Sequence, residues 1–172
     1  TWHDDKLAAD FYLAKGIVDF LLKSLAVSGR IEYRATSSHE AMHPGRTADI
    51  YLDDDFIGYV GEVHPSVAKE YRLKRVYVFE LNLQKIIDAP KKESIYEPVS
   101  KYPTVSRDIA LVVPIEVTNQ QIVDCIKKNG GAYLKDIRLF DVYKGENIGK
   151  GFRSLAYTLQ FSNSKQTLQD EE

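Results

Sequence analysis

The sequence predicts an α+β protein built from two small domains, and three observations support this class. The chain has 172 residues, enough for two compact units. Both halves mix helix-period and strand-period apolar patterns. Residues 88–103, "DAPKKESIYEPVSKYP", are rich in proline and lysine and have little apolar periodicity, which is typical of a linker. We therefore expect one domain over residues 1–92 and a second over residues 93–172.

Composition narrows the class of protein. The apolar fraction of 44% and the charged fraction of 28% are ordinary for a soluble globular protein, and the net charge of −2 gives no overall signature of a nucleic-acid binder. Cys125 is the single cysteine, so no disulfide can form within the chain and a reducing, cytoplasmic location is expected. No apolar run approaches the ~20 residues of a membrane helix. Since the sequence starts without Met, we expect a piece of a longer protein.

The first half predicts the order α-β-β-β-α-β. An amphipathic helix of roughly 13 residues should end before Gly29. Alternation predicts a strand at 30–36, a Pro-Gly turn, and two strands within 48–63 around an acidic turn. A short helix over 64–73 and a strand over 74–83 complete this half.

The second half predicts the order β-α-β-β-α. The expected elements are strands at 104–114, 134–143 and 152–161, a helix over 118–131, and the first turn of another helix over 167–172. Thr118 and Gln121 have the spacing of a capping box. This order is typical of a ferredoxin-like split βαβ fold that lacks its last elements.

A local cluster of positive charge lies in the second half. Seven bases (Lys127, Lys128, Lys135, Arg138, Lys144, Lys150, Arg153) stand against three acids (Asp136, Asp141, Glu146) between residues 127 and 153. Such a patch on a small sheet suits a phosphate backbone, although a solvated, salt-bridged surface gives the same pattern. In 152–161, Leu155, Tyr157 and Leu159 should face the helices and leave a small polar face.

Signals for catalysis are weak. His39 and His43 flank a Pro-Gly turn and not a helix face, so a metal site is not indicated. Glu62 and His64 could form an acid/base pair or a structural hydrogen bond. Cys125 is expected to be a buried, inert thiol. No phosphate-binding or dinucleotide motif occurs.

Several stretches together resemble a known family. The stretches "ADFYLAKG", "HPGRTADIYLDDDFIGYVGEVHP" and "VYVFELNL" resemble the end of the catalytic-like module in the β subunits of bacterial phenylalanyl-tRNA synthetases. The stretches "SKYPTVSRDIALVV", "LFDVYKGENIGKGFRSLAYTLQF" and "TLQDEE" resemble the ferredoxin-fold anticodon-binding domain that follows it. The match runs in the same order over nearly the whole chain.

The resemblance implies part of an antiparallel sheet module of the class II synthetase type, without catalytic residues, followed by an anticodon-binding domain. The family forms an α2β2 tetramer that joins phenylalanine to tRNA(Phe) with ATP and Mg²⁺ at a site on the α subunit. This chain would then contact tRNA(Phe) and the α subunit, with no membrane association, no metal site and no cofactor of its own.

Individual roles can be assigned as expectations. Tyr143 would stack on an anticodon base, Asp141 and Ser154 would bond base edges, and Lys144, Lys150 and Arg153 would hold phosphates. Phe140 would point to the opposite face, into the core. A second group would be structural, shaping turns, close backbone packing or an ion pair: Pro44, Gly45, Arg46, Gly58, Gly61, Arg107 and Asp108. Because the family's domain continues past "TLQDEE", we expect a damaged or domain-swapped second domain, or a longer chain.

Overall fold

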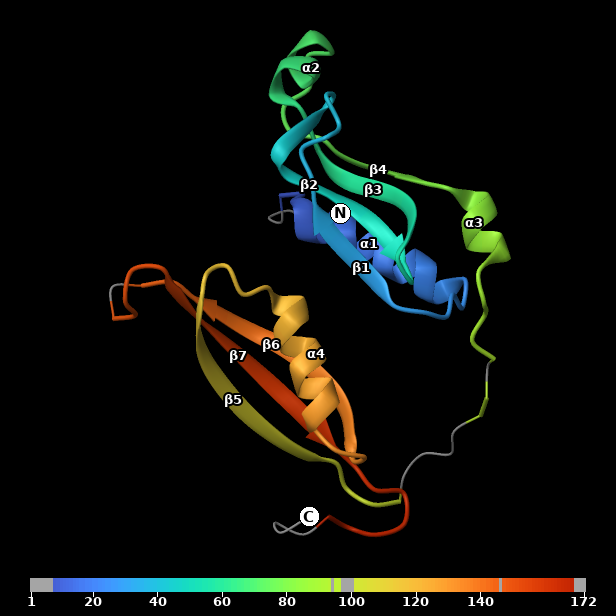
Figure 1. Cartoon of the computed structure of the whole chain (residues 1–172), viewed down its shortest axis with the longest axis vertical. Coiled ribbons are helices and arrows are strands. Elements are labelled where there is room, and N and C mark those ends of the chain that lie inside the picture. Colours follow the sequence, from blue (N-terminus) through green and yellow to red (C-terminus); the bar gives the residue numbers. More distant parts are fainter. Residues whose placement is uncertain (1–7, 94, 97–100, 146, 169–172) are drawn as a thin grey trace. The chain divides into compact units, whose positions relative to one another are not determined.

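The computed structural model describes residues 8–93, 95–96, 101–145 and 147–168 (Figure 1). It contains two compact units, Thr1–Ile95 and Tyr96–Glu172. Over the described residues, the first unit combines three helices with an antiparallel sheet and the second combines one helix with a further antiparallel sheet, so the predicted α+β class is confirmed. The expected boundary after residue 92 stays a prediction.

The first unit has a four-stranded antiparallel sheet in the order β1-β2-β3-β4. Its elements are α1 (Phe11–Ser24), β1 (Ile31–Ala35), β2 (Met42–Leu52), β3 (Asp55–Val63), α2 (Pro65–Glu70), β4 (Tyr77–Leu81) and α3 (Leu83–Asp88). The sequence predicted all of these except α3. Residues Asp53 and Asp54 form the predicted acidic turn between β2 and β3, and both have positive φ angles.

Helix α1 covers one face of this sheet. The Asp10 side chain accepts a hydrogen bond from the Leu13 N–H at 2.8 Å and so caps the helix. Val18 and Leu22 are buried against Ile50 and Val60 of the sheet. The helix ends at Ser24, well before Gly29.

The prediction of a Pro-Gly turn around Pro44 is wrong. Pro44, Gly45 and Arg46 lie inside β2, where the pairing with β3 jumps from Met42↔Val63 to Thr47↔Gly61. Four residues of β2 therefore lie opposite one residue of β3. This irregularity accommodates a proline, which has no N–H to donate to the ladder, without ending the strand.

The sequence pattern did not predict helix α3, because its residues follow a strand directly. The Asn82 side chain accepts from the Lys85 N–H at 3.1 Å and caps this short helix. Ile86 is buried in the core of the first unit. The helix therefore packs against the sheet and is not part of a linker.

The second unit has a three-stranded antiparallel sheet in the order β5-β7-β6 over the described residues. Its elements are β5 (Val105–Pro114), α4 (Asn119–Asn129), β6 (Leu134–Tyr143) and β7 (Phe152–Phe161), all within two residues of the predicted spans. The expected helical turn over 167–172 falls largely outside the described residues. Figure 1 shows α4 lying against one face of this sheet.

Helix α4 begins with the predicted capping box. The Thr118 side chain accepts from the Gln121 N–H, and the Gln121 side chain accepts from the Thr118 N–H at 2.8 Å. Ile122 packs on Leu155, Tyr157 and Leu159 of β7. Cys125 lies on the far side of the helix and is exposed, so the expectation of a buried thiol is wrong.

Candidate nucleic-acid interface

The face of the second sheet opposite α4 is the candidate interface. Tyr157 and Leu155 point toward α4 and are buried, so their neighbours in β7 point the other way. Ser154 lies directly opposite Tyr143 of β6, and Ala156 lies opposite Asp141. Tyr143, Asp141 and Ser154 therefore share this face, which we call the open face.

A β-bulge places Tyr143 on the open face. Leu139 pairs with Tyr157, but Asp141 pairs with Ala156, so Phe140 is an extra residue in β6. If residues 139–143 alternated strictly, Tyr143 would face α4 as Leu139 does. Phe140 itself is 53% exposed, so the expected core position is wrong. The bulge could not be read from the apolar pattern of the strand.

Gly145 supports the position of the Tyr143 ring. A Cβ atom added to Gly145 would collide with the hydroxyl and ring carbons of Tyr143. The ring thus lies over the backbone of the loop and stays partly exposed, with 44% of its surface accessible. Lys144 and Lys150 are both exposed in the same loop. Tyr143 therefore lies at the end of the open face from which the loop that carries both lysines begins.

Arg153 does not belong to the open face. It alternates with Ser154 and lies on the α4 side of β7, where its Nη2 donates to the carbonyl oxygen of Val117 at 2.6 Å. Its Nε is buried and has no hydrogen-bond partner. The structure therefore ties Arg153 to the segment before α4 and separates it from Lys144 and Lys150.

The expected pair of Arg107 and Asp108 is also separated. Adjacent strand residues point to opposite faces, and Arg107 lies opposite Leu159 while Asp108 lies opposite Thr158. Asp108 instead accepts from the Thr158 hydroxyl at 2.7 Å on the open face. Arg138 of β6 also lies opposite Thr158 and extends the polar row. The sequence indicated Arg138 only as one base among seven.

In the first unit a buried carboxylate organises the irregular part of β2. Glu62 is only 5% exposed and accepts from the Arg46 guanidinium at 2.7 Å and from the Tyr77 hydroxyl at 3.1 Å. Arg75 lies 3.6 Å from its second oxygen. Burial alone would raise the pKa of Glu62, but these hydrogen bonds and the two guanidinium charges lower it below its ordinary value.

The acid/base pair considered for Glu62 and His64 does not form. His64 caps α2 instead: its Nδ1 lies 2.6 Å from the Ser66 hydroxyl and accepts from the Ser66 N–H. Among the described residues, no group of three or more His, Cys, Asp or Glu side chains could hold a metal ion. No helix in the part of the chain that the structure describes is long and apolar enough to cross a membrane.

Two glycines of β3 allow the neighbouring strands to approach closely. A Cβ atom at Gly58 would collide with the carbonyl oxygen of Glu80 in β4. A Cβ atom at Gly61 would lie 2.8 Å from the carbonyl oxygen of Arg46. Both neighbours are backbone atoms that cannot turn away, so these positions hold β3 close to the strands on either side.

Comparison with known proteins accounts for both units. Residues 1–83 match the family model of the phenylalanyl tRNA synthetase beta chain CLM domain, and residues 100–172 match that of the ferredoxin-fold anticodon binding domain. The chain is 46% identical over 172 residues to the phenylalanine–tRNA ligase beta subunit of Lactiplantibacillus plantarum, which covers 100% of this chain and 21% of that protein. The beta subunit of Bacillus subtilis is 45% identical over 171 residues, with 99% and 21% covered.

These two domains in this order define part of an aminoacyl-tRNA synthetase subunit. The chain belongs to the phenylalanyl-tRNA synthetase beta chain family. It spans about a fifth of the length of the curated relatives that it matches. The second unit is confirmed as a ferredoxin-fold domain.

Proposed function

We propose that this chain is the C-terminal part of the β subunit of a cytoplasmic phenylalanine–tRNA ligase. Its second unit binds the anticodon of tRNA(Phe), and its first unit is a scaffold that contacts the α subunit in an α2β2 assembly. The observation that carries the proposal is the open face, where Tyr143, Asp141 and Ser154 lie together next to the loop that carries the exposed Lys144 and Lys150. The family membership of residues 100–172 supports it.

The open face has the chemistry to read unpaired bases. A partly exposed aromatic ring can stack on a base, and stacking contributes about 1–3 kcal/mol per base. The carboxylate of Asp141 accepts hydrogen bonds, while the Ser154 hydroxyl can donate or accept, so together they can distinguish base edges. Lys144 and Lys150 can hold the neighbouring phosphates. Arg153 is left out of this set because it is held on the other face.

The chain contributes binding and not chemistry to the ligase reaction. Arg46 and Tyr77 both donate hydrogen bonds to Glu62, and His64 caps a helix, so none of these residues forms a nucleophile–base pair. ATP and Mg²⁺ would act at a catalytic site outside this chain.

Helix α1 supports a contact with the α subunit. Its outer side exposes Leu13, Ile17 and Phe20, which recur at the i, i+4 and i+7 spacing of one helix face. Phe20, the last member of this row, is 72% exposed, which is unusual for a large apolar side chain next to other exposed apolar side chains. An α subunit that packs on this row would bury it.

The test uses the full-length β chain in its assembly with the α subunit. Binding of tRNA(Phe) is compared with binding of the same tRNA carrying a changed anticodon, for the native protein and for Tyr143→Ala. We expect Tyr143→Ala to weaken cognate binding by ~1–3 kcal/mol, roughly 5- to 150-fold. It should also remove most of the preference for the cognate anticodon.

Tyr71→Ala is the matched control, since Tyr71 is a 72% exposed tyrosine in the first unit. Equal loss in both variants, or an unchanged anticodon preference in Tyr143→Ala, would contradict anticodon reading by the open face.

A further inference from the structure

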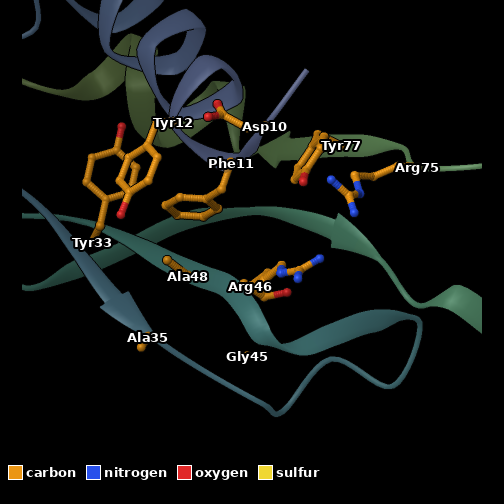
Figure 2. A pocket seen from close by; sticks show the side chains of 11 residues that line it. Asp10, Phe11, Tyr12, Tyr33, Ala35, Gly45, Arg46, Ala48, Arg75 and Tyr77 are labelled. Carbon is orange, nitrogen blue, oxygen red and sulfur yellow. The ribbon is translucent and has the colours of Figure 1, made fainter. Parts of the chain in front are cut away.

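A pocket of about 520 Å³ opens on the α1 side of the first sheet, at the N-terminal end of α1. Its walls come from the start of α1, from β1, from the irregular part of β2 and from the segment that leads into β4 (Figure 2). The volume falls within the ~300–1,000 Å³ typical of small-molecule sites. Small residues, among them Ala35, Gly45 and Ala48, line it and leave the space open.

Aromatic rings line one end of this pocket. Figure 2 shows Phe11, Tyr12 and Tyr33 together at one end of the view. The rings of Phe11 and Tyr12 meet edge to face, with centroids 5.6 Å apart. The Tyr33 hydroxyl donates to Asp19 at 2.6 Å, which fixes the position of the ring. A flat, apolar ligand can stack at this end.

Two arginines line the other end. Arg46 and Arg75 both lie beside Glu62, and both remain about half exposed, at 47% and 58% of the side-chain surface. One guanidinium is enough to balance one buried carboxylate, so this end keeps one surplus positive charge. Each guanidinium has five N–H donors, and the Glu62 contacts occupy a minority of them.

The remaining charged residue on the wall sets the orientation of a ligand. Asp10 lies at the aromatic end, where its carboxylate caps α1. It repels an anion from that end, while the arginines attract one at the other. A planar guanidinium is well suited to pair with a carboxylate or phosphate through two hydrogen bonds.

We propose that this pocket binds a small ligand that joins a flat aromatic ring to a single oxyanion group, either an aromatic carboxylate or a nucleoside monophosphate. The ring lies among Phe11, Tyr12 and Tyr33, and the oxyanion lies on Arg46 and Arg75. This site is separate from the open face of the second unit and does not depend on the proposed function.

The test is titration calorimetry on the full-length chain in its native assembly. The two probes are 4-hydroxyphenylacetate and uridine 5′-monophosphate. Uridine carries the ring without the anion, and inorganic phosphate carries the anion without the ring. We expect saturable binding of at least one probe, with at least tenfold weaker binding of uridine and phosphate.

Three variants locate the binding. Arg75→Ala and Tyr12→Ala change exposed side chains at the two ends of the pocket and should each weaken the bound probe by about tenfold or more. Arg34→Ala is the control, because Arg34 lies on the opposite face of the same sheet, across from Asp49. Melting temperatures of all three confirm that the fold is kept.

The outcomes separate the two ligand sources. Saturation by 4-hydroxyphenylacetate alone assigns a carboxylate ligand, saturation by uridine 5′-monophosphate alone assigns a phosphate ligand, and saturation by both supports the shared chemistry. Absence of saturable binding by either probe overturns the proposal. So does binding that Arg75→Ala and Tyr12→Ala leave unchanged, or binding of phosphate as tight as that of the nucleotide.

Discussion

The ring of Tyr143 lies over the backbone of Gly145, two residues further along the loop, and it occupies the space where a side chain at residue 145 would begin. The aromatic ring of the open face is therefore oriented by a glycine. Because the colliding atoms are the far end of a side chain that can rotate, Gly145→Ala should turn the ring away and leave the strands intact.

We expect Gly145→Ala to weaken tRNA(Phe) binding by nearly as much as Tyr143→Ala, on the order of 1–3 kcal/mol, with little change in melting temperature. Binding is measured on the full-length chain in its assembly. Gly149→Ala is the matched control, since a Cβ there would meet only the Phe152 ring at an ordinary 3.8 Å. An unchanged affinity in Gly145→Ala would show that the position of the ring does not matter for binding.

Lys144 and Arg153 should respond differently to replacement by alanine. Lys144 is exposed in the loop, so Lys144→Ala should lower tRNA affinity at low salt and reduce the slope of log K against log salt by about 0.7, the value for one contact to a single strand. Arg153 is hydrogen-bonded to the Val117 carbonyl, so Arg153→Ala should lower stability by roughly 1.5–3 kcal/mol and leave the slope unchanged.

Hydrogen exchange of the amides in β7 and α4 reports the stability change, and titrations at several salt concentrations report the slope. If Arg153→Ala reduced the slope of log K against log salt and left amide hydrogen exchange unchanged, Arg153 would be a phosphate-binding residue after all.

Glu62 should make the first unit sensitive to acid. Its pKa in the folded protein is lower than the ordinary value of 4.5, so its ionised form stabilises the fold above that ordinary value. This stabilisation is lost as the pH falls from the unfolded-state pKa through the lower folded-state pKa. Glu62→Gln should lower the melting temperature at pH 7, and the difference from the native protein should shrink below about pH 4. A constant difference from pH 7 to pH 3 would show that the carboxylate charge is not responsible.

The exposed row on α1 should be required for assembly. Phe20→Ser should reduce the amount of α subunit that copurifies with the full-length β chain, because it removes the most exposed apolar side chain of that row. Tyr71→Ser is the matched control, with the same exposure of 72% outside the row. Equal recovery of the α subunit with both variants would argue against a contact through α1.

Most elements of the fold could be predicted because their signals are local. Thr118 and Gln121 carry a complete capping box, and the residues of β7 alternate between Leu155, Tyr157 and Leu159 on one side and polar or small residues on the other. Helix α3 was not predicted, since six residues after a strand are too few for a helical repeat to be recognised.

The site could be predicted only in part, because its geometry depends on strand pairing. The sequence indicated Tyr143, Asp141 and Ser154, and the structure brings these three together. Alternation with Leu155 already places Arg153 on the α4 face, but its charge and its place beside the loop led to the phosphate-binding prediction. The contacts of Arg46 with Glu62 join residues 16 apart across an irregular strand, and no local pattern reports such a contact.

The extra residue at Phe140 makes the length of β6 as important as its composition. Deleting Phe140 would join the Leu139↔Tyr157 and Asp141↔Ala156 pairs in a regular ladder and keep Asp141 and Tyr143 on the open face. Deleting Val142 from the regular part of the strand would instead pair Tyr143 with Leu155 and turn its ring toward α4. Substitutions at Phe140 should be well tolerated, since its side chain is largely in solvent. Deletion of Val142 should therefore abolish the interface even where the strand still forms, whereas deletion of Phe140 should leave it in place.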